Sequence, residues 1–415
     1  MPKSTSKDAS KSTKSRDSVK EKLLQKKEGF LQADSLLGFG DISKTFKSLK
    51  GQYADVEAIS SATDSEAFIA KVFKEVLSPF LLERLSVFAE HYPEIYQRHI
   101  FCGWLAGLVA REMGLSDEMV INSVGAALSR DIGLLYLPDT LLDENAKYGP
   151  SEWNAMKTHT LVGEIVCRDI GEINAEQSRA IVEHHERHDG LGYPRGLKGK
   201  SLSIISEIVG AVDTIGAIRF KRFEHSGRNL RDVYAYIQMN ENQFNPKVNS
   251  ALFSVLVKTG VERSTVNPFK TIDKLVSHLY VRAAAMNGVI HLMHKLNDAL
   301  VFFEKGPKRK ELQEVNQLVT KLINQSGVLD KEMLEWLNTM DNSYDYRKVN
   351  LAELSEMELM QNELYWHLKR VSDACQAFHD LEMNKRNPSC QVITTVLKCL
   401  NEKNLPRAAA SIRKN

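Results

Sequence analysis

The chain has 415 residues, of which 43% are hydrophobic and 26% charged, and its formal net charge is +2 at pH 7. This balance is typical of a globular protein with two or three domains. No apolar run is long enough to span a bilayer and the N-terminus has no apolar signal-peptide core, so we expect a cytoplasmic protein without a transmembrane segment.

Residues 1–28 contain nine Lys/Arg against four Asp/Glu and almost no apolar side chains before Leu23. Because such a segment cannot bury a core, we expect a disordered basic arm over 1–28. A basic arm can contact nucleic acid or an anionic membrane surface, but the lack of interleaved aromatic residues favours a solubilising tail.

From Leu23 onward, apolar residues recur at three- and four-residue spacing, which predicts amphipathic helices. Strand signals are scarce, so we expect an all-α fold, a helical bundle that begins with an N-terminal helical region over 29–95. Helix start signals recur along it. They are Ser116 before Asp117, Ser151 after Pro150, and Asn174 with Gln177 three residues later.

Residues 189–203 interrupt the helices, because they hold four glycines and Pro194. A helix resumes near Ser203 and carries Asp213 inside an otherwise apolar stretch.

Longer amphipathic segments then predict a C-terminal helical domain over 259–415. We expect one amphipathic helical segment that runs through 272–300 and stops at Gly306 and Pro307, and another from about Leu351 to Leu381. Their apolar stripes are typical of a core, although a homodimer or partner-helix seam is an alternative. His291 and His294 are spaced to hold a metal ion, but an HxxH pair without a carboxylate is more typical of a surface.

The five cysteines are widely spaced and contain no CxxC pair, which indicates neither a disulfide framework nor a zinc knuckle. We expect them to be reduced. They are Cys102, Cys167, Cys375, Cys390 and Cys399.

Three histidines gather in the helix end IVEHHERHDG. We expect His184, His185 and His188 on about one face, because positions i, i+1 and i+4 lie near one another on a helix. Imidazoles beside carboxylates suit divalent metals. Taken alone, the cluster is equally well explained as solvated histidines favoured by the helix dipole.

Two aspartates need an explanation of the same kind. Asp131 begins an apolar run after the helix of Met119 to Ser129, and Asp213 lies on an apolar helix. Burial of an unpaired carboxylate costs several kcal/mol, so both need a metal or another cation. The simplest explanation makes them metal ligands together with the histidines, in the core of a helical bundle.

The run HHERHDGLGYP from His184 to Pro194 resembles the HD-GYP signature HHExxDGxGYP. Neighbouring motifs of the family follow in the same order. This chain has RDIGLLYLPD where the family has HDIGKxGxPD, EWNAMKTH where it has EWxxMKxH, AVDTIGAI where it has AVADxYDAL, and QFNP where it has QFDP. The resemblance covers about 160 residues and predicts an HD-GYP-type domain over 96–258.

The resemblance implies an all-α bacterial phosphodiesterase that hydrolyses cyclic di-GMP with two or three iron or manganese ions. Such ions would polarise the phosphate and lower the pKa of a bound water. The metal ligands it implies are His99, Asp131, His159, His184, His185 and Asp213, with Asp131 as the bridging carboxylate of the catalytic centre.

For Gly192, Tyr193 and Pro194, the resemblance adds docking of GGDEF-type partners and a wall of the nucleotide pocket to their role as a rigid turn. Arg222 lies near the family's RPYR segment. It either contacts phosphate or is a solvated arginine, and the second alternative is the more common.

The chain departs from the family at the site itself. Arg130 replaces the histidine of the HD pair and cannot be a ligand, because a guanidinium has no lone pair to donate. Leu134 replaces the family lysine, Gly216 replaces an aspartate, and Asn245 stands where aspartate is frequent. Electrostatic groups of this kind are each worth roughly a hundredfold to a thousandfold in rate.

We therefore expect a degenerate site with fewer ions and impaired catalysis, acting in cyclic di-GMP signalling by nucleotide or metal binding or by protein docking. The site either keeps one metal through Asp131, His159, His184 and His185, or Arg130 holds Asp131 and Asp213 as an ion-pair substitute. Two alternatives stay open: an active cyclic di-GMP phosphodiesterase, and a helical interaction scaffold that binds neither metal nor nucleotide.

Overall fold

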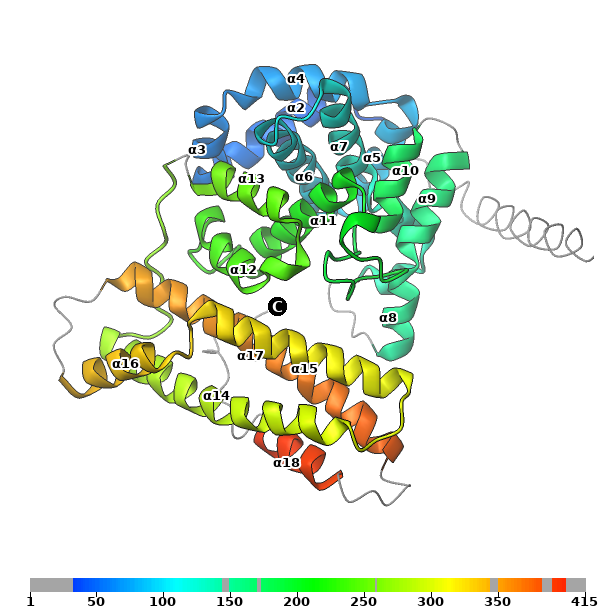
Figure 1. Cartoon of the computed structure of the whole chain (residues 1–415). Coiled ribbons are helices and arrows are strands. Elements are labelled where there is room, and N and C mark those ends of the chain that lie inside the picture. The colour runs from blue at the N-terminus through cyan, green and yellow to red at the C-terminus, as the bar shows by residue number, and fades with distance from the viewer. Residues whose placement is uncertain are drawn as a thin grey trace, which may run out of the picture. The chain divides into compact units, whose positions relative to one another are not determined.

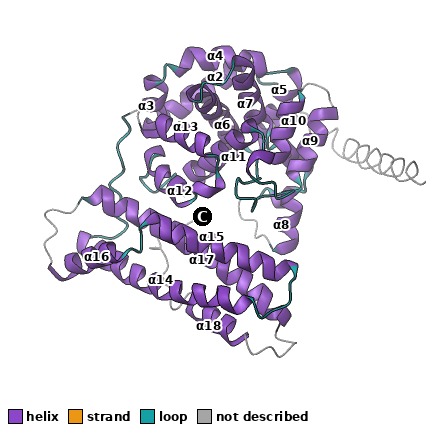
Figure 2. Ribbon diagram, in the orientation of Figure 1, coloured by secondary structure: helices purple, strands orange, loops and turns teal. Residues whose placement is uncertain are grey.

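The structure is a computed structural model of the chain (Figure 1). It describes residues 33–143, 149–169, 173–257, 260–343, 350–382 and 390–400, and the basic arm expected over 1–28 lies outside them. These residues form helices and loops and contain no strand (Figure 2), which confirms the all-α prediction.

The chain divides into two compact units. The first comprises Met1–Lys221 and Glu241–Val261, and the second comprises Arg222–Asn240 and Glu262–Asn415. The chain therefore passes from the first unit into the second, returns for one helix, and leaves again.

The first unit contains all six residues that the HD-GYP resemblance implies as metal ligands. Its α-helices are α2 (Phe39–Gln52), α3 (Ala54–Ala62), α4 (Ser65–Val76), α5 (Pro79–His91), α6 (Pro93–Glu112), α7 (Asp117–Ser129), α8 (Pro150–Lys157), α9 (His159–Asp169), α10 (Ala175–Glu183), α11 (Ile204–Ala217) and α13 (Pro246–Val257). Short 3-10 turns are η1 (Ile132–Tyr136), η2 (Asp139–Leu141), η3 (Gly199–Ser201) and η6 (Glu241–Gln243), and a π-helical turn, η4 (Ile218–Arg222), follows α11.

Helix α6 lies at the centre of the first unit, and every residue from His99 to Ala110 is buried. It packs closely on α7, because a Cβ at Gly103 would meet the Leu128 side chain at 2.9 Å. The end of α7 thus lies beside α6, which sets the position of the residues that follow it.

Several predicted helix starts are confirmed by their caps. The side chains of Ser116, Asn174 and Ser203 accept hydrogen bonds from the backbone N–H groups of Met119, Gln177 and Ser206. Helix α8 differs, since it begins at Pro150 after Gly149 and Ser151 does not cap it.

The second unit is built on two long helices, which confirms the segments expected over 272–300 and from Leu351. Its α-helices are α12 (Val233–Met239), α14 (Ile272–Leu300), α15 (Pro307–Ser326), α16 (Lys331–Ser343), α17 (Leu351–Glu382) and α18 (Cys390–Leu400), with a 3-10 turn η5 (Leu230–Asp232). Their apolar stripes form one core that includes Leu279, Met286, Leu364 and Leu368.

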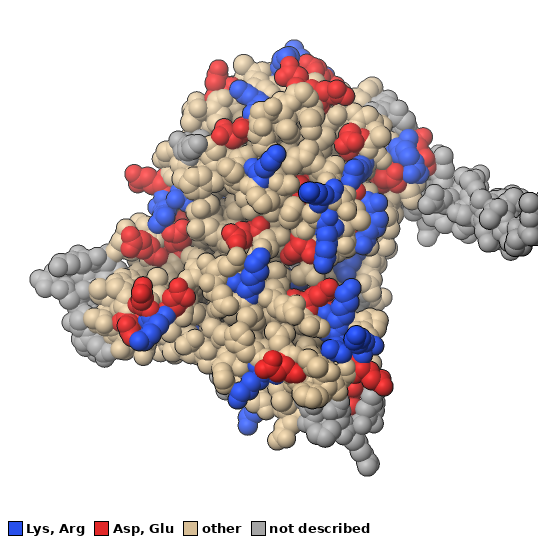
Figure 3. Space-filling model, viewed as in Figure 1, with Lys and Arg blue, Asp and Glu red and all other residues tan. Residues whose placement is uncertain are grey.

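Among the described helices, none is both long enough and apolar enough to cross a bilayer. On the face shown in Figure 3, basic and acidic side chains are interspersed.

Candidate metal centre

Four of the predicted ligands converge in the first unit. Donor atoms of Asp131, His159, His184 and His185 all lie within 4.8 Å of one another. The first three residues are buried, whereas the side chain of His185 is 19% exposed. The cluster therefore opens toward the surface at His185.

The backbone around Asp131 explains how a carboxylate reaches the interior. Helix α7 ends at Ser129, and the chain turns through Arg130 and Asp131 into η1. Gly133 then lets α9 approach, because a Cβ there would lie 1.9 Å from the backbone oxygen of His159. A glycine at this position is needed for His159 to face Asp131.

The histidine rings are oriented for metal binding. Nδ1 of His159 donates to the Met156 carbonyl at 2.7 Å, and Nδ1 of His184 donates to the Ile181 carbonyl at 2.7 Å. In the neutral rings, the two Nε2 atoms then carry lone pairs, yet they lie only 3.3 Å apart. Two facing lone pairs repel unless a cation lies between them, so these residues fit a divalent metal.

The two oxygens of Asp131 divide the site. Oδ1 lies 3.5 Å from Nε2 of His159 and 3.7 Å from Nε2 of His184. Oδ2 lies 3.2 Å from the guanidinium nitrogen Nη2 of Arg98 and 3.2 Å from Nη2 of Arg130. One side of the carboxylate thus faces metal donors, and the other faces two permanent cations.

Arg130 occupies the second half of the site. It is fully buried, its Nε donates to Oδ1 of Asp213 at 2.8 Å, and its NH1 donates to the Ala127 carbonyl at 2.6 Å. Nε2 of His99 lies 3.8 Å from Oδ2 of Asp131 and has no hydrogen-bond partner among the described residues. The guanidinium therefore lies among three of the residues nominated as ligands.

Burial and charge shift the pKa values at the site. Burial is the largest single effect on Asp131 and Asp213 and raises both pKa values. The charge of Arg130, added to the smaller effect of Arg98 and the neighbouring histidines, outweighs burial and holds both pKa values below the usual range. Burial, with the charge of Arg130, lowers the pKa of His99 to about 3. Burial, followed by repulsion from His184, lowers the pKa of His185 well below its usual value. Neutral imidazole is the form that binds metals.

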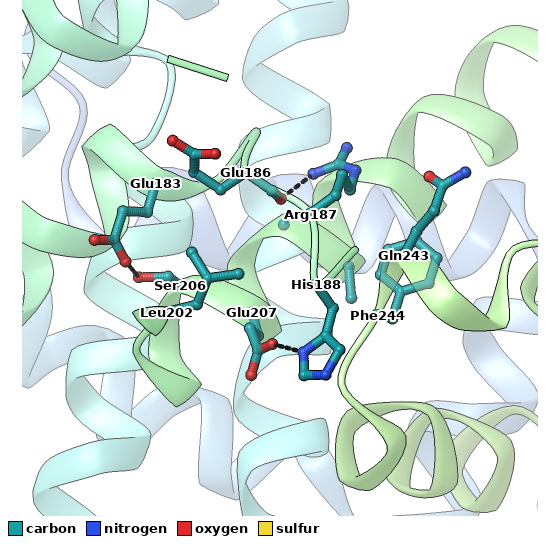
Figure 4. Close-up of a pocket in the computed structure, with 11 residues that line it drawn as sticks. Glu183, Glu186, Arg187, His188, Leu202, Ser206, Glu207, Gln243 and Phe244 are labelled. Atoms are coloured by element: carbon teal, nitrogen blue, oxygen red, sulfur yellow. Dashed lines mark hydrogen bonds and ion pairs between the residues drawn. The ribbon is translucent and has the colours of Figure 1, made fainter. Parts of the chain in front are cut away.

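His188 does not share a face with His184 and His185, so that prediction is wrong. Helix α10 ends at Glu183 and the chain turns away. Nδ1 of His188 lies 2.5 Å from Glu207, at a small separate pocket that Arg187 and Phe244 also line (Figure 4).

The loop that carries Gly192, Tyr193 and Pro194 is held by a buried carboxylate. Glu186 accepts hydrogen bonds from the backbone N–H of Arg195 at 2.6 Å and of Leu197 at 2.9 Å. Close packing of the loop requires Gly192, because a Cβ there would lie 2.4 Å from the Arg187 nitrogen. These contacts agree with a rigid turn.

Arg222 begins the second unit. Its NH1 donates to Glu363 at 3.0 Å, and its side chain is 45% exposed. Within the described residues, it is therefore paired with a carboxylate of its own unit.

The other degenerate positions are filled by packing. Leu134 is buried in η1 at 6% exposure, and its apolar side chain supplies no cation at the position of the family lysine. Gly216 lies on α11, where a Cβ would meet Sγ of Cys102 at 2.7 Å. An aspartate at 216 would therefore need the Cys102 side chain to shift.

Sequence reasoning missed several residues near the site. Arg98 donates a hydrogen bond to Asp131. Because it directly precedes the predicted ligand His99, its position in the sequence could have indicated a place near the site. Lys221 also lies near the site, since burial, followed by the charge of Arg98, lowers its pKa. Trp153 and Lys157 belong to the EWNAMKTH motif, but nothing in their spacing indicated contact with Tyr193.

Residues 85–248 match the family model described as HD domain. The chain is 33% identical over 178 residues to a cyclic di-GMP phosphodiesterase of Thermotoga maritima, covering 42% of this chain and 48% of that protein. It is 32% identical over 150 residues to the cyclic di-GMP phosphodiesterase response regulator RpfG of Xanthomonas campestris, covering 36% and 40%. A 3'3'-cGAMP-specific phosphodiesterase of Vibrio cholerae is 29% identical over 150 residues, covering 36% of this chain and 32% of that protein.

A solved HDG"Y"P protein, Bd1817 from Bdellovibrio bacteriovorus, aligns with a TM-score of 0.36 and 16% identity over 59% of this chain and 81% of that one. The chain spans less than half the length of the three curated relatives. Residues 85–248 are thus similar to an HD domain. The resemblance to HD-GYP phosphodiesterases that the motifs indicated is confirmed by these relatives.

Proposed function

We propose that the HD-GYP-type domain, residues 96–258, binds a cyclic dinucleotide at a site with one divalent metal ion, and that hydrolysis is impaired. The position of Arg130 is the observation that carries this proposal. Its guanidinium pairs with Asp131 and Asp213 while four metal donors remain clustered beside it.

Arg130 takes the place of one ion. The ligand set that the HD-GYP resemblance implies is the reference here, and His99, Asp131 and Asp213 would hold metal in it. Here a fixed positive charge lies among them and donates to Asp213 at 2.8 Å. Because the guanidinium has no lone pair and stays protonated, it neutralises the carboxylates without binding metal.

The ion that remains has a complete set of donors. Asp131, His159, His184 and His185 offer one oxygen and three nitrogens, which suit iron or manganese as the family implies. When bound, such an ion polarises a phosphate and lowers the pKa of its water. The protein itself fixes the ring orientations through the carbonyls of Met156 and Ile181.

Leu134 supports impaired hydrolysis. The family lysine at this position would supply a cation to the phosphate, and Leu134 is instead buried among apolar neighbours in η1. Each lost electrostatic group lowers a rate by about 10²–10³-fold.

Metal content tests the proposal. Protein purified without oxygen or chelators should contain one iron or manganese ion per chain and should bind cyclic di-GMP in calorimetry, with little conversion to pGpG or GMP. The double variant Arg130→His, Leu134→Lys should gain a second ion and measurable hydrolysis. Two or more ions in the parent, with hydrolysis equal to that of the double variant, would overturn the proposal.

We also propose a cytoplasmic location and docking of a GGDEF-type partner at the loop of Gly192, Tyr193 and Pro194. A homodimer through the C-terminal helices, over 259–415, stays a prediction. Light scattering of the full chain and pull-down with a purified GGDEF domain test the two interactions.

A further inference from the structure

Aromatic rings lead from the metal cluster to the surface. The Tyr193 ring stacks on His185, with centroids 4.8 Å apart and an interplanar angle of 29°. The Trp153 ring meets Tyr193 edge-on at 6.3 Å and 75°. Nζ of Lys157 lies 5.6 Å from the centroid of each of these two outer rings. The result is a continuous cationic and aromatic surface beside the cluster.

This surface lies where a ligand must approach. Within the four-residue cluster, His185 is the member with an accessible side chain, at 19% exposure. Tyr193 is the ring that stacks on it, and Trp153 beyond is 45% exposed. A ligand bound at the cluster through one group therefore extends over Tyr193 toward Trp153.

Helix geometry fixes Trp153 and Lys157 relative to the cluster. They are four residues apart on α8 and so lie on one face of the helix. Lys157 is also two residues before His159, whose Nε2 points into the cluster. The short segment that follows α8 therefore fixes where Trp153 and Lys157 lie relative to His159.

The chemistry of the surface matches a nucleobase. An indole provides a flat π-face for stacking, and an adjacent ammonium attracts the phosphate of the same nucleotide. Base–aromatic stacking tolerates different bases, because every base has a π-face. One relative named above is a cyclic di-GMP phosphodiesterase, and another is a 3'3'-cGAMP-specific phosphodiesterase.

We propose that Trp153, with Lys157 beside it, stacks a purine base of the cyclic dinucleotide whose phosphate lies at the Asp131 and His185 cluster. This inference rests on the proposed function and adds the element that recognises the base. The role of Trp153 is to bind ligand, so its loss lowers affinity and leaves the metal site intact.

Calorimetric titration of the full chain with cyclic di-GMP, in the presence of Mn²⁺, tests this. Trp153→Ala should weaken binding about tenfold or more, and Trp153→Phe should keep most of the affinity. Trp366→Ala is the matched control, because Trp366 is 41% exposed with Arg370 over its ring at 5.1 Å, and it lies in the second unit. This control should bind as the parent does.

A second titration uses inorganic phosphate, which has no base, as a competitor. Phosphate should compete equally well in the parent and in Trp153→Ala, whose metal content and thermal midpoint should also match the parent. If Trp153→Ala loses phosphate binding or metal as well, Trp153 supports the structure of the site, and the inference is overturned.

The outcomes separate the two proposals. If the parent binds cyclic di-GMP and Trp153→Ala binds it equally well, the stacking inference is wrong and the proposed function stands. If the parent binds no cyclic di-GMP, the proposed function fails, and the inference fails with it.

Discussion

Replacing Arg130 by alanine should expose the electrostatic conflict that this side chain resolves. Asp131 and Asp213 are 2% and 6% exposed. Arg130 donates a hydrogen bond to Asp213 and forms an ion pair with Asp131. Removal of one partner from a buried ion pair costs about 3–5 kcal/mol, because the remaining charge is left uncompensated. In chelator, the thermal midpoint of the first unit should therefore fall by about 10 °C.

Divalent metal should reverse much of this loss. Without the guanidinium, Asp131, Asp213 and His99 Nε2 become free to bind a second ion. An ion at a hundred times its dissociation constant stabilises the folded state by about 2.7 kcal/mol. Differential scanning calorimetry of the full chain, with chelator and with Mn²⁺, should show a larger metal-induced rise for Arg130→Ala than for the parent.

Arg219→Ala is the matched control. Arg219 makes a buried two-pronged pair with Asp55 in the same unit, with Nε 2.9 Å from one carboxylate oxygen. Its loss should destabilise the unit by a comparable amount, and Mn²⁺ should raise its midpoint only as much as that of the parent. If Mn²⁺ raises both variants equally, or if Arg130→Ala is as stable as the parent in chelator, the assignment of Arg130 to an ion's place is refuted.

Two further predictions concern a glycine at the site and a histidine in the second unit. Gly133→Ala should push α9 away, since its Cβ would lie 1.9 Å from the His159 oxygen; metal affinity should fall, and stability should drop by about 1–3 kcal/mol or more. Gly163→Ala, whose nearest contact is 3.1 Å, should be milder, and an equal loss in both would contradict this reasoning. Burial lowers the pKa of His367 to about 3. Between about pH 6.5 and pH 3 the unfolded chain therefore binds a proton at this residue that the folded chain does not. The free energy of unfolding should fall by up to about 1.4 kcal/mol per pH unit as the pH drops through this range. Urea unfolding at several pH values should show a flatter profile for His367→Asn and the parental profile for exposed His291→Asn.

The sequence predicted the helices well where the signal was local. The amphipathic period predicted α17 almost to the residue, and it predicted α14 except that this helix ends at Leu300, before the expected stop at Gly306. Side-chain caps at Ser116 and Ser203 marked two starts. A cap depends on residues within one turn, so its signal survives in the sequence.

The fine geometry of the site could not be read in the same way. The predicted position of His188 assumed that the helix continued, but α10 ends at Glu183 and the loop turns His188 toward Glu207. The contact of Trp153 with Tyr193 joins segments 40 residues apart. Such contacts depend on how α8 packs and leave no periodic trace.

The charges of the site explain why one substitution affects its whole metal stoichiometry. Asp131 and Asp213 are balanced by Arg98 and Arg130, so the Oδ2 side of Asp131 is neutral without metal. Two unit charges 4 Å apart repel by about 4 kcal/mol at the effective dielectric of a protein surface, and a divalent ion beside a guanidinium meets about twice that. On the histidine side, Nε2 of His159 and of His184 face Oδ1, whereas the guanidinium of Arg130 lies at Oδ2. Arg130 thus disfavours the second ion and spares the first, and a single replacement at 130 is enough to change the number of ions that the domain binds.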